Sequence, residues 1–332
     1  MGNKIRYEFK QRFVMSKIAI VMAILVGLAG AIYAYIDNEY LVQNISPAYV
    51  TEVFMPLAEY GFEQSIIQNN SSPAEGIPVL LYHGLSDQND GKNLGISDFL
   101  QQMIALKKAG YRTVTIEDLQ AFIRGKKELP EKSFMITFDD GRKDSYYKSN
   151  DILKKLNYTA VMFAITEYIG TSRFYLSEKE LKKMLESGRW QIESHGARAH
   201  DWIVVLPNGA KDHFLTNRLW LEQEQRFETE GEFRQRIRDD LVKSKIYLES
   251  HFNVNVLGFA YPYDDTGEKS INCPECKTIV AETVHAIYPL GFLQANIDKE
   301  DFLNHQDSSL EARRINVLSN WTASDLMNIL ER

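Results

Sequence analysis

The sequence feature that most constrains the fold is an apolar run ending in two carboxylates and a glycine, Ser133-Phe-Met-Ile-Thr-Phe-Asp-Asp-Gly141. The residues from Phe134 to Phe138 are apolar or β-branched, which is typical of a strand buried on both faces. In parallel α/β proteins, side chains at the carboxyl end of a strand face the crevice or barrel mouth where ligands bind. We therefore expect Asp139 and Asp140 to turn toward one pocket, with Gly141 freeing the backbone to leave the strand. The alternative is an Asp-Asp-Gly turn without a function.

Strand-like and helix-like segments alternate along the rest of the chain. Further strands are expected at 77–82, 113–116, 159–165, 190–194, 256–261, 286–293 and 315–318. Helices are expected from Ser97 to Gly110, around Leu119, at 144–156, 177–186 and about 230–251, and from Thr322 through Leu330. Because strands that alternate with helices form βαβ units, this order predicts an α/β fold with a parallel sheet, closed or open.

Composition limits the classes of protein to which the chain can belong. Its 332 residues are 44% hydrophobic and 25% charged, enough for one large domain with an appendage. The net charge is −7, and the first 36 residues carry five basic side chains against one acidic, so the remainder is near −11. We therefore expect no nucleic-acid partner, because phosphate binding needs a basic face.

An uncharged run of nineteen residues, Ile18 to Ile36, is close to the ~20 that span a bilayer as a helix. Basic residues precede it, so the positive-inside rule places the N-terminus in the cytoplasm and the body of the protein outside. The alternative is a cleaved signal peptide, since Ala29-Gly-Ala31 resembles a cleavage site, but the run exceeds a usual signal core of 7–15 residues. We expect a basic tail at 1–17, a membrane anchor at 18–36, a stalk or linker at 37–76 and a catalytic domain at 77–332.

A pair of histidines follows another predicted strand, in Glu193-Ser-His195-Gly-Ala-Arg-Ala-His200. Neutral imidazole is a favoured ligand of zinc-like ions, and two histidines joined by a short loop can bind one ion from the same side. With Asp140 they make a set of two histidines and one carboxylate that leaves positions open for water and substrate. The alternative is that one imidazole of the pair only satisfies buried backbone groups.

The residues "ITFDDG", Asp144-Ser-Tyr-Tyr and "ILKKLNYTAVMFAI" resemble the first motif of the NodB-homology polysaccharide deacetylases, carbohydrate esterase family 4. The resemblance covers roughly residues 77 to 331. It implies an irregular (β/α)7 barrel and a divalent metal ion, with zinc expected first and nickel, cobalt or iron as alternatives. The family hydrolyses N-acetyl groups of polymers that contain N-acetylglucosamine and releases acetate.

Two features are similar to one branch of that family, the deacetylases of poly-β-1,6-N-acetylglucosamine in biofilm exopolysaccharide. The histidines are separated by four residues, where many members have three, and "FLTNRLW" and "FETEGEFRQRIRDDL" follow. The alternatives are a peptidoglycan or chitin-oligomer deacetylase and, in another class, an inactive carbohydrate-binding relative at the cell surface.

The resemblance also implies roles in metal-assisted amide hydrolysis. Asp139 is the general base, and Asp140, His195 and His200 are the metal ligands. In Phe259-Ala-Tyr261-Pro-Tyr263-Asp-Asp, the proline makes a rigid turn, and the backbone N–H of Tyr263 would face the developing oxyanion.

The chain departs from the family in three places. Asp264 stands where the family usually has glycine, and no late Leu-x-His occurs near Ile315-Asn-Val317. His83, in "LLYHGL", is then the candidate general acid, with a structural imidazole as the alternative. Arg142 replaces a usual aromatic residue, and we assign it and Tyr261 to substrate binding.

The cysteines Cys273 and Cys276 are the only two in the sequence. Outside the cell, a small disulfide-closed loop is expected. A redox motif would suit a cytosolic protein, and a structural zinc site normally needs four ligands.

Overall fold

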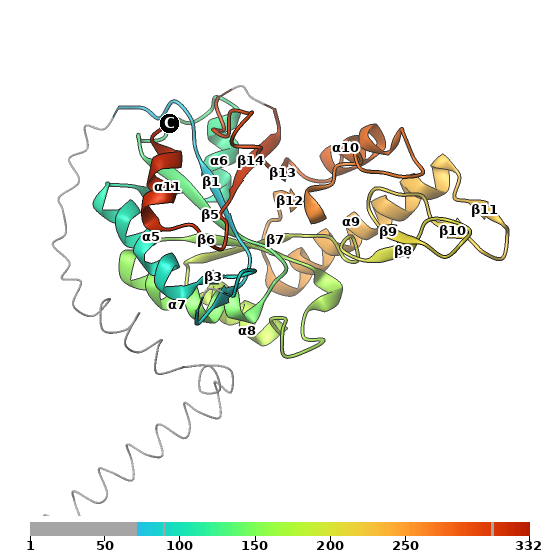
Figure 1. Ribbon diagram of the computed structural model, residues 1–332, viewed down its shortest axis with the longest axis horizontal. Helices are drawn as coiled ribbons and strands as arrows, with labels where there is room; N and C mark the ends of the chain where they lie inside the picture. The colour runs from blue at the N-terminus through green and yellow to red at the C-terminus, as the bar shows by residue number, and fades with distance from the viewer. Residues whose placement is uncertain (1–71, 89, 307–308) are drawn as a thin grey trace, which may run out of the picture. The chain divides into compact units, whose positions relative to one another are not determined.

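A computed structural model describes residues 72–88, 90–306 and 309–332 of the chain (Figure 1). Within this part, seven parallel strands form a closed barrel, because β1 pairs with both β14 and β5. The order around the barrel is β1 (Val79–Tyr82), β14 (Glu311–Asn316), β13 (Leu290–Gln294), β12 (Gly258–Ala260), β7 (Trp190–Ser194), β6 (Ala160–Ala164) and β5 (Ser133–Phe138). The short strand β4 (Arg112–Thr113) extends the sheet beyond β5. The expected seven-stranded α/β barrel is confirmed.

The barrel is filled by side chains that alternate along its strands, since successive strand residues point to opposite faces. Met135, Val161 and Phe292 belong to one buried cluster. Helix α6 (Ile116–Ile123) contributes Leu119 and Phe122 to the same cluster, so it closes the end of the barrel at which the strands begin. The opposite end, where the strands finish, is left for the loops.

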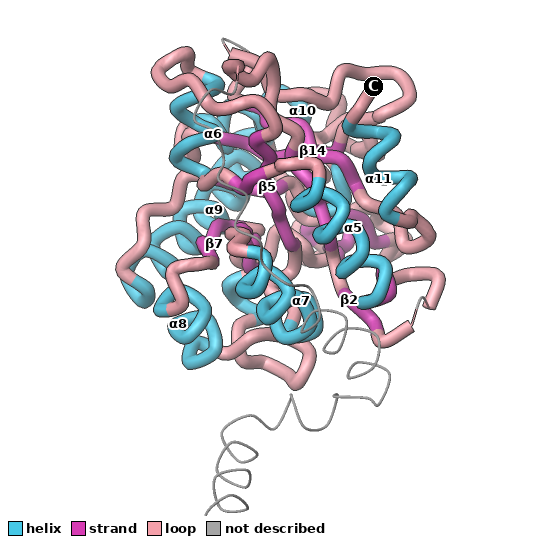
Figure 2. The backbone as a smooth tube through the Cα atoms, turned by 90° about the vertical axis from the view of Figure 1, so that its left-hand side faces the viewer, coloured by secondary structure: helices cyan, strands magenta, loops and turns pink. Residues whose placement is uncertain are grey.

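Helices surround the strands, as Figure 2 shows. They are α5 (Ile96–Lys108), α7 (Lys143–Leu156), α8 (Glu178–Glu186), α9 (Glu230–Phe252), α10 (Cys276–His285) and α11 (Ala323–Leu330). The described chain also contains the short strands β2 (Leu85–Ser86) and β3 (Leu94–Gly95) and the 3-10 turns η2 (Thr166–Tyr168) and η3 (Pro262–Asp264). Helices α8, α9 and α11 begin with a capping box, in which a threonine or serine and an acidic residue satisfy the first backbone N–H groups.

The segment between β7 and α9 carries two hairpins. One pairs β8 (Trp202–Val204) with β9 (Lys211–His213), and the other pairs β10 (Trp220–Leu221) with β11 (Arg226–Phe227). A disulfide joins Cys273, in the loop after η3, to Cys276, the first residue of α10, which confirms the expected pairing.

The barrel is weakest where β7 meets β12, because the two strands share a single residue pair, Phe259 with Ser194. Side chains replace the missing ladder bonds. Glu193 Oε2 accepts the N–H groups of Leu257 at 2.8 Å and Gly258 at 2.7 Å, and His195 Nδ1–H donates to the Ala260 carbonyl at 2.7 Å. Burial raises the pKa of Glu193 to about 8.

Element boundaries differ from the expected ones where local capping decides. Helix α5 begins at Ile96, after Gly95, so Ser97 lies inside its first turn instead of capping it. The strand expected at 113–116 ends at Thr113, because Thr115 caps α6. The strand expected at 286–293 begins only at Leu290, since α10 runs to His285.

The N-terminal expectations fall mostly outside the described residues, which leave out the predicted anchor at 18–36 and the stalk up to residue 71. No helix within 72–88, 90–306 or 309–332 is long and apolar enough to span a bilayer. The last part of the expected linker contacts the domain, because Pro73 forms an isolated β-bridge with Pro130.

Candidate active site and metal centre

Strand β5 is followed directly by Asp139 and Asp140, the two carboxylates that the sequence singled out. Asp140 has a φ of 74° and Gly141 has a φ of 71°, so two consecutive residues adopt the left-handed conformation. Aspartate tolerates this region better than most residues, at a cost of roughly 1–2 kcal/mol. Because of this turn, the alternation of side chains along the strand does not continue to Asp140.

Asp140, His195 and His200 converge on one point, as predicted. One ligand atom from each residue lies within 4.8 Å of the other two. Asp140 Oδ1 is 3.6 Å from His195 Nε2 and 3.5 Å from His200 Nε2. Since Nδ1 of His195 donates to the Ala260 carbonyl, its Nε2 keeps a lone pair for a metal ion. Two imidazoles and one carboxylate fit a zinc-like divalent cation.

His200 is also prepared for a cation. Burial is the largest cause that lowers the pKa of His200, to about 4, and the neighbouring His195 is the second. The imidazole is therefore neutral near pH 7, which is the form that binds a metal.

The loop between the two histidines is held by a carboxylate from helix α9. Asp240 accepts the backbone N–H of Ala197 at 3.0 Å and that of Arg198 at 2.6 Å. Gly196 has a φ of 83°, and a Cβ there would lie 2.4 Å from Ala199 Cβ, so only glycine fits this turn. Asp240 thus fixes the path of the four-residue connection, and burial raises the pKa of Asp240 to about 6.

Asp139 lies at the inner wall of the barrel and is 3% exposed. Arg314, on β14, donates to both of its oxygens, from Nη1 to Oδ1 at 2.7 Å and from Nη2 to Oδ2 at 2.9 Å. Burial acts to raise the pKa of Asp139, but the charge of Arg314, the neighbouring His195 and the hydrogen bonds from Arg314 together outweigh it and hold this pKa below the usual range. Asp139 is therefore ionised in neutral solution.

Arg314 is the site residue that sequence reasoning missed. It is 1% exposed and pairs in register with Val79, an inward-facing residue, so its side chain enters the barrel. The signal in the sequence is Ala312-Arg-Arg-Ile-Asn, a strand with two charges where a parallel barrel needs apolar residues. Only the register shows which arginine points inward.

His83 follows strand β1 at the same end of the barrel as Asp139, whose N–H donates to the Tyr82 carbonyl at 3.3 Å. Its side chain is exposed and lines a cleft of about 370 Å³ with residues 316–320. Ser145 Oγ donates to the His83 carbonyl at 2.7 Å, which fixes the backbone. The role of His83 as general acid remains a prediction.

Tyr263 lies beside the metal ligands. Its hydroxyl donates to the His200 carbonyl at 2.7 Å, and its ring centroid is 4.1 Å from that of His200. Tyr263 and Asp264 have φ values of 59° and 51°, so the turn keeps a left-handed shape although glycine is replaced. Asp264 Oδ1 compensates by accepting the Gln294 N–H at 2.7 Å. The oxyanion role of Tyr263 remains a prediction.

The two residues assigned to substrate binding make other contacts. Tyr261 is 2% exposed and follows the inward Ala260, so it points outward, where its hydroxyl donates to Glu311 at 2.8 Å. Arg142 forms an ion pair with Asp144 at 2.6 Å and lies 4.6 Å from the centroid of the Phe174 ring. Neither placement favours direct contact with a substrate, and both roles remain predictions.

The barrel and the site together define a class of protein, which comparisons with known proteins support. Residues 126–273 match the polysaccharide deacetylase family. The matched segment carries Asp139, Asp140, His195 and His200, so this part of the chain is similar to a polysaccharide deacetylase domain. In fold it is similar to the de-N-acetylase from Aggregatibacter actinomycetemcomitans, with a TM-score of 0.64 at 19% identity over 76% of this chain and 99% of that one. It is also similar in fold to IcaB from Ammonifex degensii, with a TM-score of 0.60 at 22% identity over 78% of this chain and 99% of that one.

More specific similarity is found among curated proteins. The chain is 25% identical over 252 residues to the poly-beta-1,6-N-acetyl-D-glucosamine N-deacetylase of Escherichia coli strain K12, covering 69% of this chain and 37% of the relative. It is 31% identical over 185 residues to the protein of the same name from Staphylococcus epidermidis, covering 54% of this chain and 57% of the relative. The chain thus spans between about a third and three fifths of the length of these relatives.

The first prediction concerns the metal ligands. Asp140→Asn removes the anionic ligand, so we expect zinc affinity to fall by at least the roughly 10–100-fold that altered partners of metal ligands already cause. Zinc content per chain and a competition titration measure this loss. Glu268→Gln, at an exposed ion pair with Lys277, is the control and should bind zinc like the wild type. Unchanged affinity in Asp140→Asn would contradict the assigned ligand set.

The second prediction concerns Arg314. Because the pKa of Asp139 is depressed, the ion pair stabilises the fold above pH ~4 and loses this effect as pH falls through the folded pKa. Arg314→Lys keeps the charge but not the two-pronged contact, so the pKa of Asp139 should rise. If it rises by one unit, activity at the acidic limb should fall about 10-fold, with recovery at higher pH.

A profile of kcat/KM against pH tests this shift, with thermal unfolding as a check on folding. Arg313→Lys is the matched control, because Arg313 is the adjacent arginine and its side chain is 42% exposed. Identical profiles for Arg314→Lys and the wild type would show that Arg314 does not set the ionisation of Asp139.

Proposed function

We propose that this protein removes N-acetyl groups from an extracellular polysaccharide of N-acetylglucosamine and releases acetate, with poly-β-1,6-N-acetylglucosamine as the substrate. The observation that carries this proposal is the convergence of Asp140, His195 and His200 next to the buried carboxylate of Asp139. An inactive carbohydrate-binding protein would not need a ligand set and an ionised base held together in this way.

The chemistry divides among the residues as follows. A divalent cation bound by Asp140, His195 and His200 would polarise the acetamide carbonyl and lower the pKa of water. Asp139 accepts a proton from the attacking water, and Arg314 keeps its carboxylate ionised and oriented. The N–H of Tyr263 stabilises the negative charge that develops on the carbonyl oxygen.

The leaving amine needs a proton when the C–N bond breaks. His83 supplies it in this proposal, because it directly follows Tyr82, whose carbonyl accepts the Asp139 N–H, and its exposed side chain lines a cleft at this end of the barrel. Residues 316–320 form the other wall of that cleft, in the region where a late histidine would stand in other members of the family, and they contain none.

The substrate is inferred from similarity to poly-β-1,6-N-acetylglucosamine deacetylases and from the four-residue histidine spacing. A peptidoglycan or chitin-oligomer deacetylase would use the same chemistry. Acetate release by the purified protein from poly-β-1,6-N-acetylglucosamine, chitin oligomers and peptidoglycan separates these alternatives. Release from none of them, with metal supplied, would refute the enzymatic proposal.

The protein acts outside the cytoplasm in this proposal, held at the cell membrane by residues 18–36. The nineteen uncharged residues and the basic residues before them support it. The disulfide between Cys273 and Cys276 is compatible with an oxidising compartment.

The third prediction concerns Asp139. Asp139→Asn keeps the volume of the side chain and deletes the base, so turnover should fall by about 10²–10⁴-fold while metal content stays near one per chain. Acetate release measures turnover, and thermal unfolding is measured in parallel because Arg314 loses its anionic partner. Wild-type deacetylation of every polymer by Asp139→Asn would show that the mechanism is wrong.

The fourth prediction concerns the anchor. Full-length protein should fractionate with membranes and resist extraction by salt, because a spanning helix is held by hydrophobic burial. A chain that lacks residues 1–36 is the control and should stay in the soluble fraction. Recovery of a mature chain that begins near Ile32 would show cleavage instead.

A further inference from the structure

Tyr263 is enclosed between two imidazole rings. His213 lies flat against it, with ring centroids 4.2 Å apart and an interplanar angle of 6°, while His200 lies on it at 4.1 Å and 44°. The Tyr263 hydroxyl accepts a hydrogen bond from Trp202 Nε1 at 3.0 Å and donates to the His200 carbonyl. Tyr263 therefore links His200, a proposed metal ligand, to His213, which has no role in the proposed mechanism.

His213 is held in this orientation by a buried carboxylate. Its Nδ1–H donates to Asp265 Oδ2 at 2.7 Å, and the Asp265 side chain is 1% exposed. Asp265 also accepts from Thr216 Oγ1 at 2.7 Å and from the Gly267 N–H at 2.9 Å. The Asp265 carboxylate would keep these two hydrogen-bond donors even without His213. It does not rely on the histidine alone to satisfy its oxygens.

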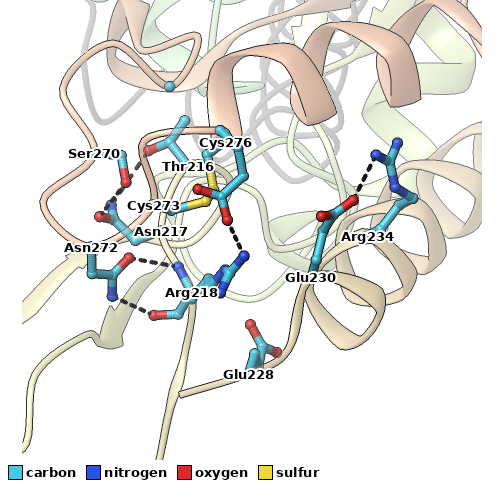
Figure 3. Close-up of a disulfide and its surroundings, with 12 residues drawn as sticks. Thr216, Asn217, Arg218, Glu228, Glu230, Arg234, Ser270, Asn272, Cys273 and Cys276 are labelled. Atoms are coloured by element: carbon cyan, nitrogen blue, oxygen red, sulfur yellow. Dashed lines mark hydrogen bonds and ion pairs between the residues drawn. A yellow bond between two sulfur atoms is a disulfide. The ribbon is translucent and has the colours of Figure 1, made fainter.

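The segments that carry His213 and Asp265 are joined by further polar contacts, as Figure 3 shows around the disulfide. Asn272 accepts from the Arg218 N–H at 2.9 Å and donates to the Arg218 carbonyl at 2.8 Å. Asn217 Oδ1 accepts from Ser270 Oγ at 3.1 Å. The disulfide Cys273–Cys276 adds a covalent link in the same region, so the segments around His213 are fixed by a disulfide and by hydrogen bonds.

The turn at Tyr263 and Asp264 needs such support, because both are non-glycine residues at positive φ. An L residue rarely adopts this conformation unless the surrounding structure imposes it. Asp264 is held through its bond to the Gln294 N–H, whereas Tyr263 is held through its ring and hydroxyl.

We propose that His213, anchored by Asp265, is a positioning residue whose ring holds Tyr263 in the left-handed turn and so aims its backbone N–H at the reacting carbonyl. The inference rests on the proposed deacetylation. It assigns a role to the hairpin β8–β9, which places His213 at the end of its second strand. Its effect is exerted through Tyr263, without contact between His213 and the metal.

Two substitutions separate the ring from the anchoring bond. His213→Asn keeps an amide N–H for Asp265 but removes the ring, and we expect kcat on an N-acetylglucosamine oligomer to fall 10- to 100-fold with KM within about twofold. His213→Phe keeps a flat ring and should retain most of the activity. Both variants should bind zinc like the wild type.

A matched control exists in the same chain. His251 stacks on Tyr247 on helix α9, with centroids 4.2 Å apart, and it is exposed. His251→Asn removes an equivalent ring from a second histidine–tyrosine pair and should leave kcat unchanged. Thermal unfolding of all three variants shows whether an activity loss reflects loss of the fold.

A measurement that does not depend on activity keeps this inference separate from the proposed function. Hydrogen–deuterium exchange of peptides covering residues 261–267 should be faster in His213→Asn than in the wild type and unchanged in His213→Phe. If the wild type releases no acetate but the exchange follows this pattern, the proposed function fails and the positioning role stands. Wild-type kcat and exchange in His213→Asn, equal losses in both variants, or loss of zinc from His213→Asn would each overturn the proposal.

Discussion

The ion pair between Asp139 and Arg314 is the interaction on which the rest of the site depends. A carboxylate inside a barrel is costly to ionise unless a cation accompanies it, and removing one partner of such a pair costs about 3–5 kcal/mol. Asp139 lies at the end of β5 and Arg314 lies on β14, and β1 pairs with both strands. Asp139 is therefore held ionised by a contact that exists only where the closed barrel brings the last strand beside the first ones.

The local part of the site was predictable from the sequence. Asp139 and Asp140 follow an unbroken apolar run, and His195 follows another strand, so their place at one end of a parallel sheet needs no knowledge of distant contacts. The pairing of Cys273 with Cys276 was predictable for the same reason, because the two are three residues apart. These features are fixed by neighbours in the chain.

The remaining features depend on register and on contacts between distant segments. Arg314 and Arg313 look alike in the sequence, and only pairing with Val79 shows that Arg314 points inward. The outward direction of Tyr261 follows from strand alternation after the inward Ala260, which the sequence alone does not show. Asp240 reaches the histidine loop from a helix more than forty residues away, and no motif marks it.

His195 also helps to hold β7 and β12 together, because the two strands share little pairing of their own. Its Nδ1 bridges the two strands where they share one residue pair, while its Nε2 faces Asp140. The imidazole thus links two strands of the barrel wall and also belongs to the candidate metal-binding group. A substitution of His195 alters the wall and the ligand set at once, whereas a substitution of His200, which lies in the loop beyond the strand, leaves this fastening in place. Loss of function at the two histidines therefore carries different information, because only a substitution of His195 alters the contact between β7 and β12.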